Sequence, residues 1–269
     1  LHGIRETSDG IEIGAMTTLT EVERHPLIQE RFGLLAEAAR QVASPQIRNS
    51  GTLGGNVCQD ARCWYYRYGL SCYRAGGNTC YASAPEAMNR EHSLFEANRC
   101  VAVTPSDPAP ALVALEASMV IRNSGGERVV AAEKFFMAPS VDITRMTVLE
   151  PDDLLTTIRI PNTWAGADFY FEKVADRGSW DFALVNVAAA LRVDGGRIEG
   201  ASIVVGAVQC TPRRLEEVEG LITGRDRNDE TAEMAGALAV RGAEPLKYNH
   251  FKVPLMENLV KRAVRDARA

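Results

Sequence analysis

The chain has 269 residues, of which 46% are hydrophobic, enough for one large or two ordinary domains with a substantial core. Its 30 basic and 35 acidic residues are interspersed and give a net charge of −5, which indicates no surface for nucleic acid. Because no signal peptide and no membrane-spanning apolar run is evident, we expect a cytoplasmic protein without membrane contact, whose cysteines are reduced.

The N-terminal part predicts a strand followed by two helices. Residues 11–15, Ile-Glu-Ile-Gly-Ala, alternate as a strand does. Thr20 and Glu23 have the spacing of a capping box, which predicts the start of a short helix. Residues 34–42 are rich in alanine and predict a second helix, which leads into a glycine-rich loop.

That loop has the sequence Gly51-Thr-Leu-Gly-Gly-Asn56. Its three glycines can adopt positive φ and turn backbone N–H groups toward an anion. The loop matches neither the Walker lysine pattern nor the dinucleotide G-x-G-x-x-G fingerprint. Taken alone, it is more typical of an ordinary tight turn than of a ligand site.

A polar segment at about residues 60–102 comes next, and it contains four widely spaced cysteines. These are Cys63, Cys72, Cys80 and Cys100, separated by eight, seven and nineteen residues. The segment has little core of its own, so thiolates that close on one metal centre would stabilise it. A reducing compartment favours metal over disulfides. Zinc sites usually contain a C-x2-C pair, which is absent, whereas wide spacing suits an iron–sulfur cluster; spacing alone leaves both metals open.

Three other side chains near these cysteines are interpreted more conservatively. Cys58 is expected to be a buried structural thiol, and Cys210, which comes after an apolar run, a core cysteine. His92 lies within the segment and could replace a cysteine ligand, but a loop histidine is usually only solvated.

The remainder of the chain predicts strands first and helices afterwards. A helix is expected at 109–117, and strands at 118–122, 128–130, 154–160, 169–174, 183–193 and 197–208, the last two forming a hairpin. Helices are expected at 213–223, 229–241 and 253–267, the last with one apolar face for core or subunit contact. This order is typical of an α+β fold, with a domain boundary near 162–166.

Four segments resemble motifs of one protein family, in the same order and across nearly the whole chain. Ser44-Pro-Gln-Ile-Arg-Asn-Ser-Gly-Thr-Leu-Gly-Gly-Asn56 resembles the second flavin-contacting loop in the FAD subunits of the xanthine dehydrogenase family of molybdenum hydroxylases. Residues 104–112, 149–161 and 171–182 resemble the next FAD motif, the strand after it, and the C-terminal domain. The resemblance implies the second subdomain of a PCMH-type FAD-binding domain at 1–162 and a CO dehydrogenase flavoprotein-like C-terminal domain at 166–269.

The cysteine-bearing insertion resembles that of the 4-hydroxybenzoyl-CoA reductase β subunit, which carries an extra 4Fe-4S cluster there. The resemblance implies the ligands Cys63, Cys72, Cys80 and Cys100, and favours the cluster over zinc. The spacing between Cys80 and Cys100 is longer than expected for that enzyme. The sequence therefore indicates the cofactor better than it indicates the substrate.

The family's FAD domain begins with a small subdomain whose Ala-Gly-Gly-Thr or Ala-Gly-Gly-His loop holds the FAD pyrophosphate. The chain starts at Leu1 without that loop, and residues 1–25 resemble the segment directly after this subdomain. We therefore expect a truncated or processed chain with weaker affinity for FAD.

The function that the resemblance implies is electron relay through FAD and a 4Fe-4S cluster, with the substrate chemistry on a separate molybdenum subunit. No residue stands out as a general acid or base, so no catalytic residue is expected. The residues implied to hold FAD are Thr52, Leu53, Gly54, Gly55, Asn56, Ser106, Asp107, Leu155 and Lys173. The implied partners are a molybdenum-cofactor large subunit and a 2Fe-2S small subunit, in a heterotrimer that dimerises. The alternatives are a structural zinc module in another FAD subunit of this family, and a non-catalytic scaffold for partner subunits.

Overall fold

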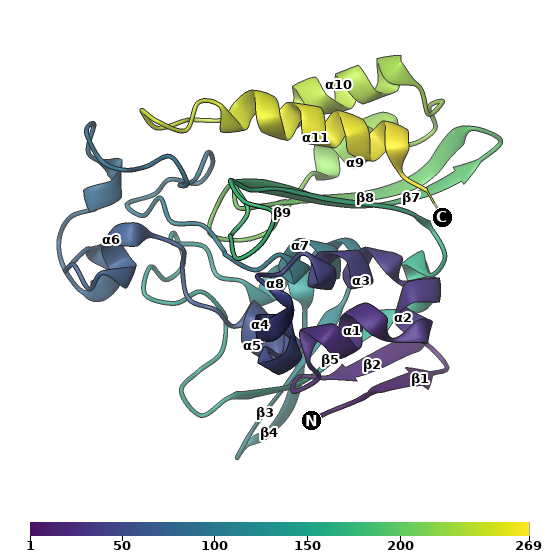
Figure 1. Cartoon of the computed structure of the whole chain (residues 1–269), viewed down its shortest axis with the longest axis horizontal. Helices are drawn as coiled ribbons and strands as arrows, with labels where there is room; N and C mark the ends of the chain where they lie inside the picture. Colours follow the sequence, from purple (N-terminus) through teal and green to yellow (C-terminus); the bar gives the residue numbers. More distant parts are fainter. Residues whose placement is uncertain (269) are drawn as a thin grey trace.

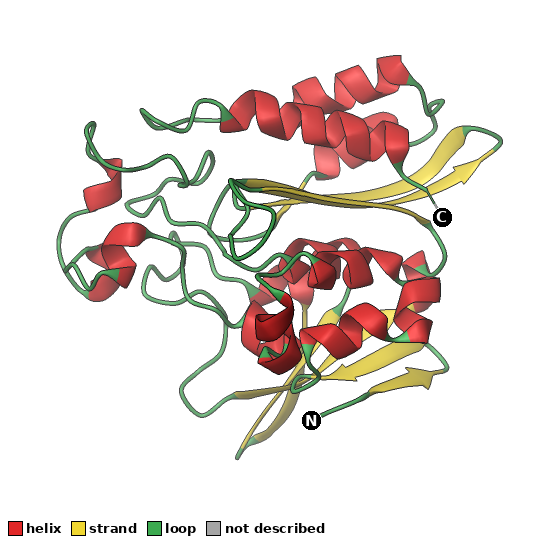
Figure 2. Cartoon of the chain, in the orientation of Figure 1, coloured by secondary structure: helices red, strands yellow, loops and turns green. Residues whose placement is uncertain are grey.

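Two antiparallel sheets alternate with two layers of helices in the computed structural model, which describes residues 1–268 (Figures 1 and 2). The first sheet has the strand order β1-β2-β5-β3-β4. Its strands are β1 (Ile4–Thr7), β2 (Gly10–Gly14), β3 (Ser118–Asn123), β4 (Gly126–Ala131) and β5 (Leu154–Pro161). The second sheet has the order β6-β7-β8-β9. Its strands are β6 (Asp168–Val174), β7 (Val185–Asp194), β8 (Arg197–Gly206) and β9 (Arg213–Arg214).

One layer of helices lies between the sheets and another covers the outer face of the second sheet (Figure 1). The inner layer contains α1 (Leu19–Arg24), α2 (Pro26–Arg31), α3 (Gly33–Arg40), α4 (Pro45–Ser50), α5 (Leu53–Val57), α7 (Pro108–Ala114) and α8 (Ala132–Phe135). The outer layer contains α9 (Glu216–Ile222), α10 (Asp229–Ala239) and α11 (Lys252–Asp266). A short 3-10 helix, η3 (Asn162–Trp164), comes after β5 and precedes the second sheet.

The sequence of β7 explains why helices cover both faces of the second sheet. Successive side chains of a strand point to opposite faces. Ala188 and Ala190 join the core between the sheets, whereas Val187, Ala189 and Leu191 join the core beneath the outer helices. A strand buried on both faces needs a nearly continuous apolar run, and residues 185–191 provide it.

The cysteine-bearing insertion, which comes between α5 and α7 in the sequence, lies at one side of the molecule (Figure 1). It contains α6 (Trp64–Arg67) and the 3-10 helices η1 (Tyr73–Ala75) and η2 (Tyr81–Ser83), and is otherwise irregular. Backbone hydrogen bonds between Arg62 and Val103, of 2.9 and 3.3 Å, bring its two ends together. Its second half is attached to the C-terminal part of the chain, since Leu94 N–H donates to the Val208 carbonyl at 2.7 Å.

The α+β organisation predicted from the sequence is confirmed, although the strand β1 and the short helices α2, α4, α5 and α8 were not predicted, and two predicted helix starts differ. The capping box of α1 is formed by Thr18 and Glu21, not by Thr20 and Glu23, because Thr18 is the last extended residue before the helix. Residues Arg213–Arg214 form an edge strand beside β8, so the next helix begins only at Glu216. No helix within residues 1–268 is both long and apolar enough to cross a membrane.

Candidate functional site

A cavity of about 770 Å³ lies where the glycine loop, the insertion and the loop between β6 and β7 meet. This volume is in the range of cofactor and ligand pockets. The glycine-loop side includes Val42, Ala43, Ile47, Gly51, Thr52, Gly55 and Asn56. The insertion contributes Arg62, Cys63, Trp64, Arg67, Glu91 and His92, and the β6–β7 loop Asp176, Arg177, Trp180, Asp181 and Phe182.

The glycine loop reaches the cavity, but its backbone differs from the prediction. None of its glycines has a positive φ: Gly54 and Gly55 belong to the short helix α5, and Gly51 is extended at the end of α4. The N–H groups of Leu53 and Gly54 donate to the carbonyls of Thr17 and Ala15, both at 2.9 Å, and Gly55 N–H donates to Thr52 Oγ1. These three N–H groups are therefore not free for an anion.

The polar contacts offered by this loop come instead from its side chains. Asn56 is buried and lines the cavity, and its Oδ1 accepts a hydrogen bond from Ser106 Oγ at 2.6 Å. In the described chain its Nδ2 donates to no other residue, which leaves this donor for a ligand. Ser106 thus fixes the orientation of the Asn56 amide from behind the cavity wall.

Asp107, which is part of the same wall, forms a buried ion pair with Lys173 behind it. Lys173 Nζ lies 2.7 Å from Asp107 Oδ2 and also donates to the carbonyls of Gln41 and Asp181, at 2.9 and 2.8 Å. Asn186 Nδ2 donates to Asp107 Oδ1 at 2.9 Å. Burial raises the pKa of Asp107, and the neighbouring ammonium opposes that rise. Asp107 lines the cavity, whereas Lys173 holds the wall together rather than facing a ligand.

Besides Ser106 and Lys173, three further residues predicted to contact FAD do not line the cavity. Leu53 and Leu155 are buried in the core between the sheets, because both belong to regular elements whose apolar side chains turn inward. Gly54 packs against Ala15 so closely that an added Cβ would lie 2.7 Å from the Ala15 Cβ. These residues support the cavity from behind.

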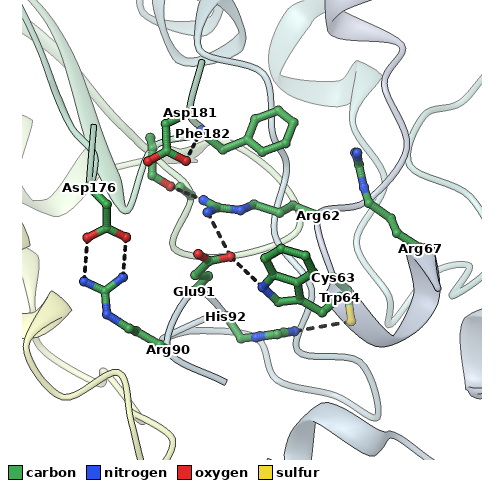
Figure 3. A network of polar contacts seen from close by, with 12 residues as sticks. Arg62, Cys63, Trp64, Arg67, Arg90, Glu91, His92, Asp176, Asp181 and Phe182 are labelled. Atoms are coloured by element: carbon green, nitrogen blue, oxygen red, sulfur yellow. Dashed lines mark hydrogen bonds and ion pairs between the residues drawn. The ribbon is translucent and has the colours of Figure 1, made fainter. Parts of the chain in front are cut away.

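Figure 3 shows the polar network that joins the insertion to the β6–β7 loop. Arg90 and Asp176 form two hydrogen bonds, of 2.7 and 2.8 Å. The Phe182 ring lies between two guanidinium groups, each 5.3 Å from its centroid, those of Arg62 and Arg67. Arg62 also pairs with Glu91 at 2.9 Å. The insertion therefore fixes the loop that closes one side of the cavity.

Sequence patterns did not indicate that the insertion forms part of this wall. The sequence gives a weak indication that the β6–β7 loop is part of the site. Charged and aromatic residues cluster at 176–182, directly after the end of a strand. Residues at strand ends and in loops often carry function.

A second, much smaller cavity brings the four predicted cysteine ligands together. Cys63, Cys72, Cys80 and Cys100 all line it, and Cys63 also lines the larger cavity. The smaller cavity has a volume of about 10 Å³, barely room for one water molecule. Within residues 1–268 no three Cys, His, Asp or Glu side chains are grouped closely enough for a single metal ion, and all six cysteines are free.

A cationic side chain lies beside this smaller cavity, and some of its N–H donors have no hydrogen-bond partner in the described part of the chain. Arg74 is buried against it, and its Nε and Nη1 have no hydrogen-bond partner in the described part of the chain, while Nη2 lies 3.7 Å from Cys210 Sγ. A hydrogen bond from Cys210, aided by Arg74, lowers the pKa of Cys100, whereas burial raises that of Cys63 to about 11. A buried guanidinium with free donors is compatible with a bound anion.

Three conservative interpretations of neighbouring residues are refined by the structure. Cys210 is a core residue, as expected, but it packs beside Cys63 and Cys100. Cys58 is half-buried rather than buried, and burial raises the pKa of its thiol to about 11. His92 is not solvated: it is 1% exposed, and its Nε2 lies 3.3 Å from Cys63 Sγ.

Two protein-family descriptions match the chain. Residues 1–163 match the FAD-binding domain in molybdopterin dehydrogenase, and residues 170–267 match the CO dehydrogenase flavoprotein C-terminal domain. Both descriptions concern flavoproteins, so FAD binding is supported. Neither the matched families nor the names of the relatives support the predicted 4Fe-4S cluster in this subunit or a relationship to 4-hydroxybenzoyl-CoA reductase.

Curated relatives match over almost the whole chain. The aldehyde oxidoreductase FAD-binding subunit PaoB of Escherichia coli is 30% identical over 264 residues, which are 97% of this chain and 79% of PaoB. The carbon monoxide dehydrogenase medium chain of Hydrogenophaga pseudoflava is 29% identical, over 99% of this chain and 78% of the relative.

Solved structures show the same architecture. Carbon monoxide dehydrogenase from Hydrogenophaga pseudoflava, in a form that lacks the Mo-pyranopterin moiety of the cofactor, matches with a TM-score of 0.75 and 28% identity. The match covers 99% of this chain and 77% of that chain. The cyanide-inactivated Cu,Mo-CO dehydrogenase matches with a TM-score of 0.76 and 25% identity, over 99% and 78% of the two chains. The chain therefore belongs to the molybdenum hydroxylase family, as an oxidoreductase FAD-binding medium subunit of the kind found in carbon monoxide and xanthine dehydrogenases.

Proposed function

We propose that this protein relays electrons through an FAD molecule bound in the 770 Å³ cavity. The observation that carries the proposal is the convergence of Thr52, Gly55, Asn56 and Asp107 on a cavity of cofactor size. FAD supplies the capacity to take up two electrons and to pass them on singly. Residues 1–162 would form the FAD-binding domain and residues 166–269 the C-terminal domain; the end of β5 at Pro161 supports this boundary.

The chain's own part in this function is to bind and shield the cofactor. Asn56 would donate a hydrogen bond from Nδ2, with its amide held by Ser106. The Asp107–Lys173 pair would keep the wall in place, and the β6–β7 loop, held by Arg90, would limit access of water.

We also propose that the protein works beside a molybdenum-cofactor large subunit and a 2Fe-2S small subunit, in a heterotrimer that dimerises. The support is that relatives matching nearly the whole chain are named as medium chains of carbon monoxide dehydrogenase. A cytoplasmic location fits the six free cysteines.

The relay is tested by Asn56→Ala in the assembled enzyme, with Asn258→Ala on the exposed face of α11 as the control. We expect Asn56→Ala to lose FAD and, in proportion, substrate-dependent reduction of an electron acceptor, while the control retains both. The readouts are the FAD content of the purified enzyme and the steady-state rate. Full electron transfer by enzyme without FAD would contradict the proposal.

A second candidate, suggested by the small cavity, is that the insertion binds a 4Fe-4S cluster through Cys63, Cys72, Cys80 and Cys100. Two observations favour it: all four thiols line one cavity, and Arg74 beside them has unpartnered donors that an anionic cluster would satisfy. A cluster needs more room than the cavity now offers, so the loops that carry Cys72 and Cys80 would have to move apart. These loops are irregular and contribute little to the main cores.

Iron, acid-labile sulfide and zinc, assayed in anaerobically purified protein, test this candidate. Four irons and four sulfides per chain, lost in Cys72→Ser and Cys80→Ser but kept in Cys58→Ser, would support it. Zinc without sulfide would favour the structural zinc alternative, and protein without metal would leave the insertion as a purely structural part of the FAD site.

A further inference from the structure

Trp180, in the β6–β7 loop, has a large side chain that packs loosely against the rest of the protein. It lines the larger cavity and is 59% exposed. Within residues 1–268 its ring stacks on no aromatic side chain or cation. Trp64, the other tryptophan on this wall, is engaged: its Nε1 donates to Glu91 at 3.1 Å, and its ring lies 6.1 Å from that of Tyr68.

The backbone at Trp180 is in a conformation that is unfavourable for a bulky residue. Its φ is +57°, and Ala43, which accepts a 2.7 Å hydrogen bond from the Trp180 N–H, has a φ of +42°. A left-handed conformation costs a non-glycine residue roughly 1–2 kcal/mol. Two such residues in contact place local backbone strain on the cavity wall, and strain of this kind clusters at ligand-binding sites.

The loop around Trp180 is held on both sides, so the indole does not belong to a free loop. Arg177 Nη2 donates to the Trp180 carbonyl at 2.8 Å, and the next carbonyl, of Asp181, accepts from Lys173 at 2.8 Å. The Phe182 ring is fixed between two arginines. These contacts determine where the exposed ring lies.

The neighbouring part of the cavity wall is apolar. Val42, Ala43 and Ile47 form it, next to the point where the Trp180 backbone is attached. An exposed indole beside an apolar wall forms a surface for a flat aromatic ring. Relying on the proposed FAD site, we propose that Trp180 stacks on a planar ring of the bound FAD, either the isoalloxazine or the adenine.

The test compares Trp180→Leu, which removes the aromatic ring, with Trp180→Phe, which keeps one. Neither replacement is glycine or β-branched, so the backbone strain is matched. Tyr248→Ala, an exposed aromatic away from the cavity, is the control. The readouts on purified protein are the FAD Kd and the fluorescence of the bound flavin.

We expect Trp180→Leu to raise the FAD Kd roughly three- to tenfold, as the loss of one aromatic pair predicts, and Trp180→Phe to stay within about twofold of the wild type. A rise in flavin fluorescence in Trp180→Leu identifies the isoalloxazine as the stacked ring, because indole quenches it; unchanged fluorescence identifies the adenine. An unchanged Kd in Trp180→Leu, or an equal loss in Trp180→Phe, would overturn the proposal. Wild-type protein that binds no FAD would instead contradict the proposed function.

Discussion

At the scale of single residues, the Asp107–Lys173 pair connects three parts of the chain at the wall of the larger cavity. Lys173 lies on β6 and Asp107 directly precedes α7, and the carbonyl of Gln41, just after α3, shares the same ammonium. Removing one partner of a buried pair leaves an uncompensated charge, which is far less favourable than losing the pair as a whole. The cavity wall therefore depends on both residues.

Lys173→Met is expected to destabilise the protein by about 3–5 kcal/mol, because Asp107 would remain buried without its cation. Urea denaturation monitored by circular dichroism measures this loss. Arg90→Ala serves as the control, since that pair is about half exposed and its loss is expected to cost no more than about 1 kcal/mol. Equal effects of the two substitutions would show that the buried pair has no special role.

At the scale of elements, α5 shows that a glycine-rich motif can be located from the sequence while its backbone conformation is predicted wrongly. Of the Gly-Gly pair, Gly55 lines the larger cavity and Gly54 does not, and the loop expected from the sequence to be a tight turn is a short packed helix. Gly54 is required by its distance to Ala15 on the neighbouring segment. That contact joins residues far apart in the chain, so local sequence patterns could not reveal it.

Gly54→Ala tests this packing explanation. The added Cβ would lie 2.7 Å from the Ala15 Cβ and 2.8 Å from its carbonyl oxygen, so α5 must shift, and we expect a loss of about 1–3 kcal/mol in stability. Gly220→Ala in α9 is the matched control, because nothing lies within 4 Å of the new Cβ. There the higher helix propensity of alanine should stabilise the protein by up to about 1 kcal/mol. Thermal unfolding of both variants shows whether glycine is needed at position 54 because it lacks a side chain or because its backbone is flexible.

The start of α11 holds the insertion against the C-terminal domain. Lys252 is fully buried, and its Nζ donates to the carbonyls of His92 and Ala207, at 2.8 and 2.6 Å. Asn249 Nδ2 donates to the His92 carbonyl as well, at 3.0 Å. Burial, reinforced by Arg62, lowers the pKa of Lys252 to about 7.

This pKa makes the stability of the protein depend on pH. Between about 7 and about 10.5 the unfolded chain binds more protons than the folded one, so the free energy of unfolding rises with pH in this window. From about pH 7 to about pH 8.5 we expect the wild type to gain about 1.5 kcal/mol relative to Lys252→Met. Urea denaturation of both proteins at the two pH values measures the difference. If the free energy of unfolding changes equally with pH in the wild type and in Lys252→Met, Lys252 does not titrate in this pH window.

At the scale of the whole molecule, the sequence was sufficient for the order of the domains but not for the complete site. The strand expected at 183–193 is found as β7 at Val185–Asp194, and the motifs at 44–56 and 104–112 contribute residues to the wall of the larger cavity. The opposite wall depends on contacts such as Arg90–Asp176, whose partners are 86 residues apart. Such contacts arise from the packing of the insertion against the second sheet, which no local pattern encodes.

The proposed relay depends on one FAD, held in the cavity between the glycine loop, the insertion and the β6–β7 loop. The most direct measurement is an anaerobic reductive titration of the purified protein, monitored by the visible absorbance of its flavin. We expect about one FAD per chain, reduced and reoxidised reversibly. A protein that binds no FAD at saturating concentration, or holds a flavin that cannot be reduced, would contradict the relay.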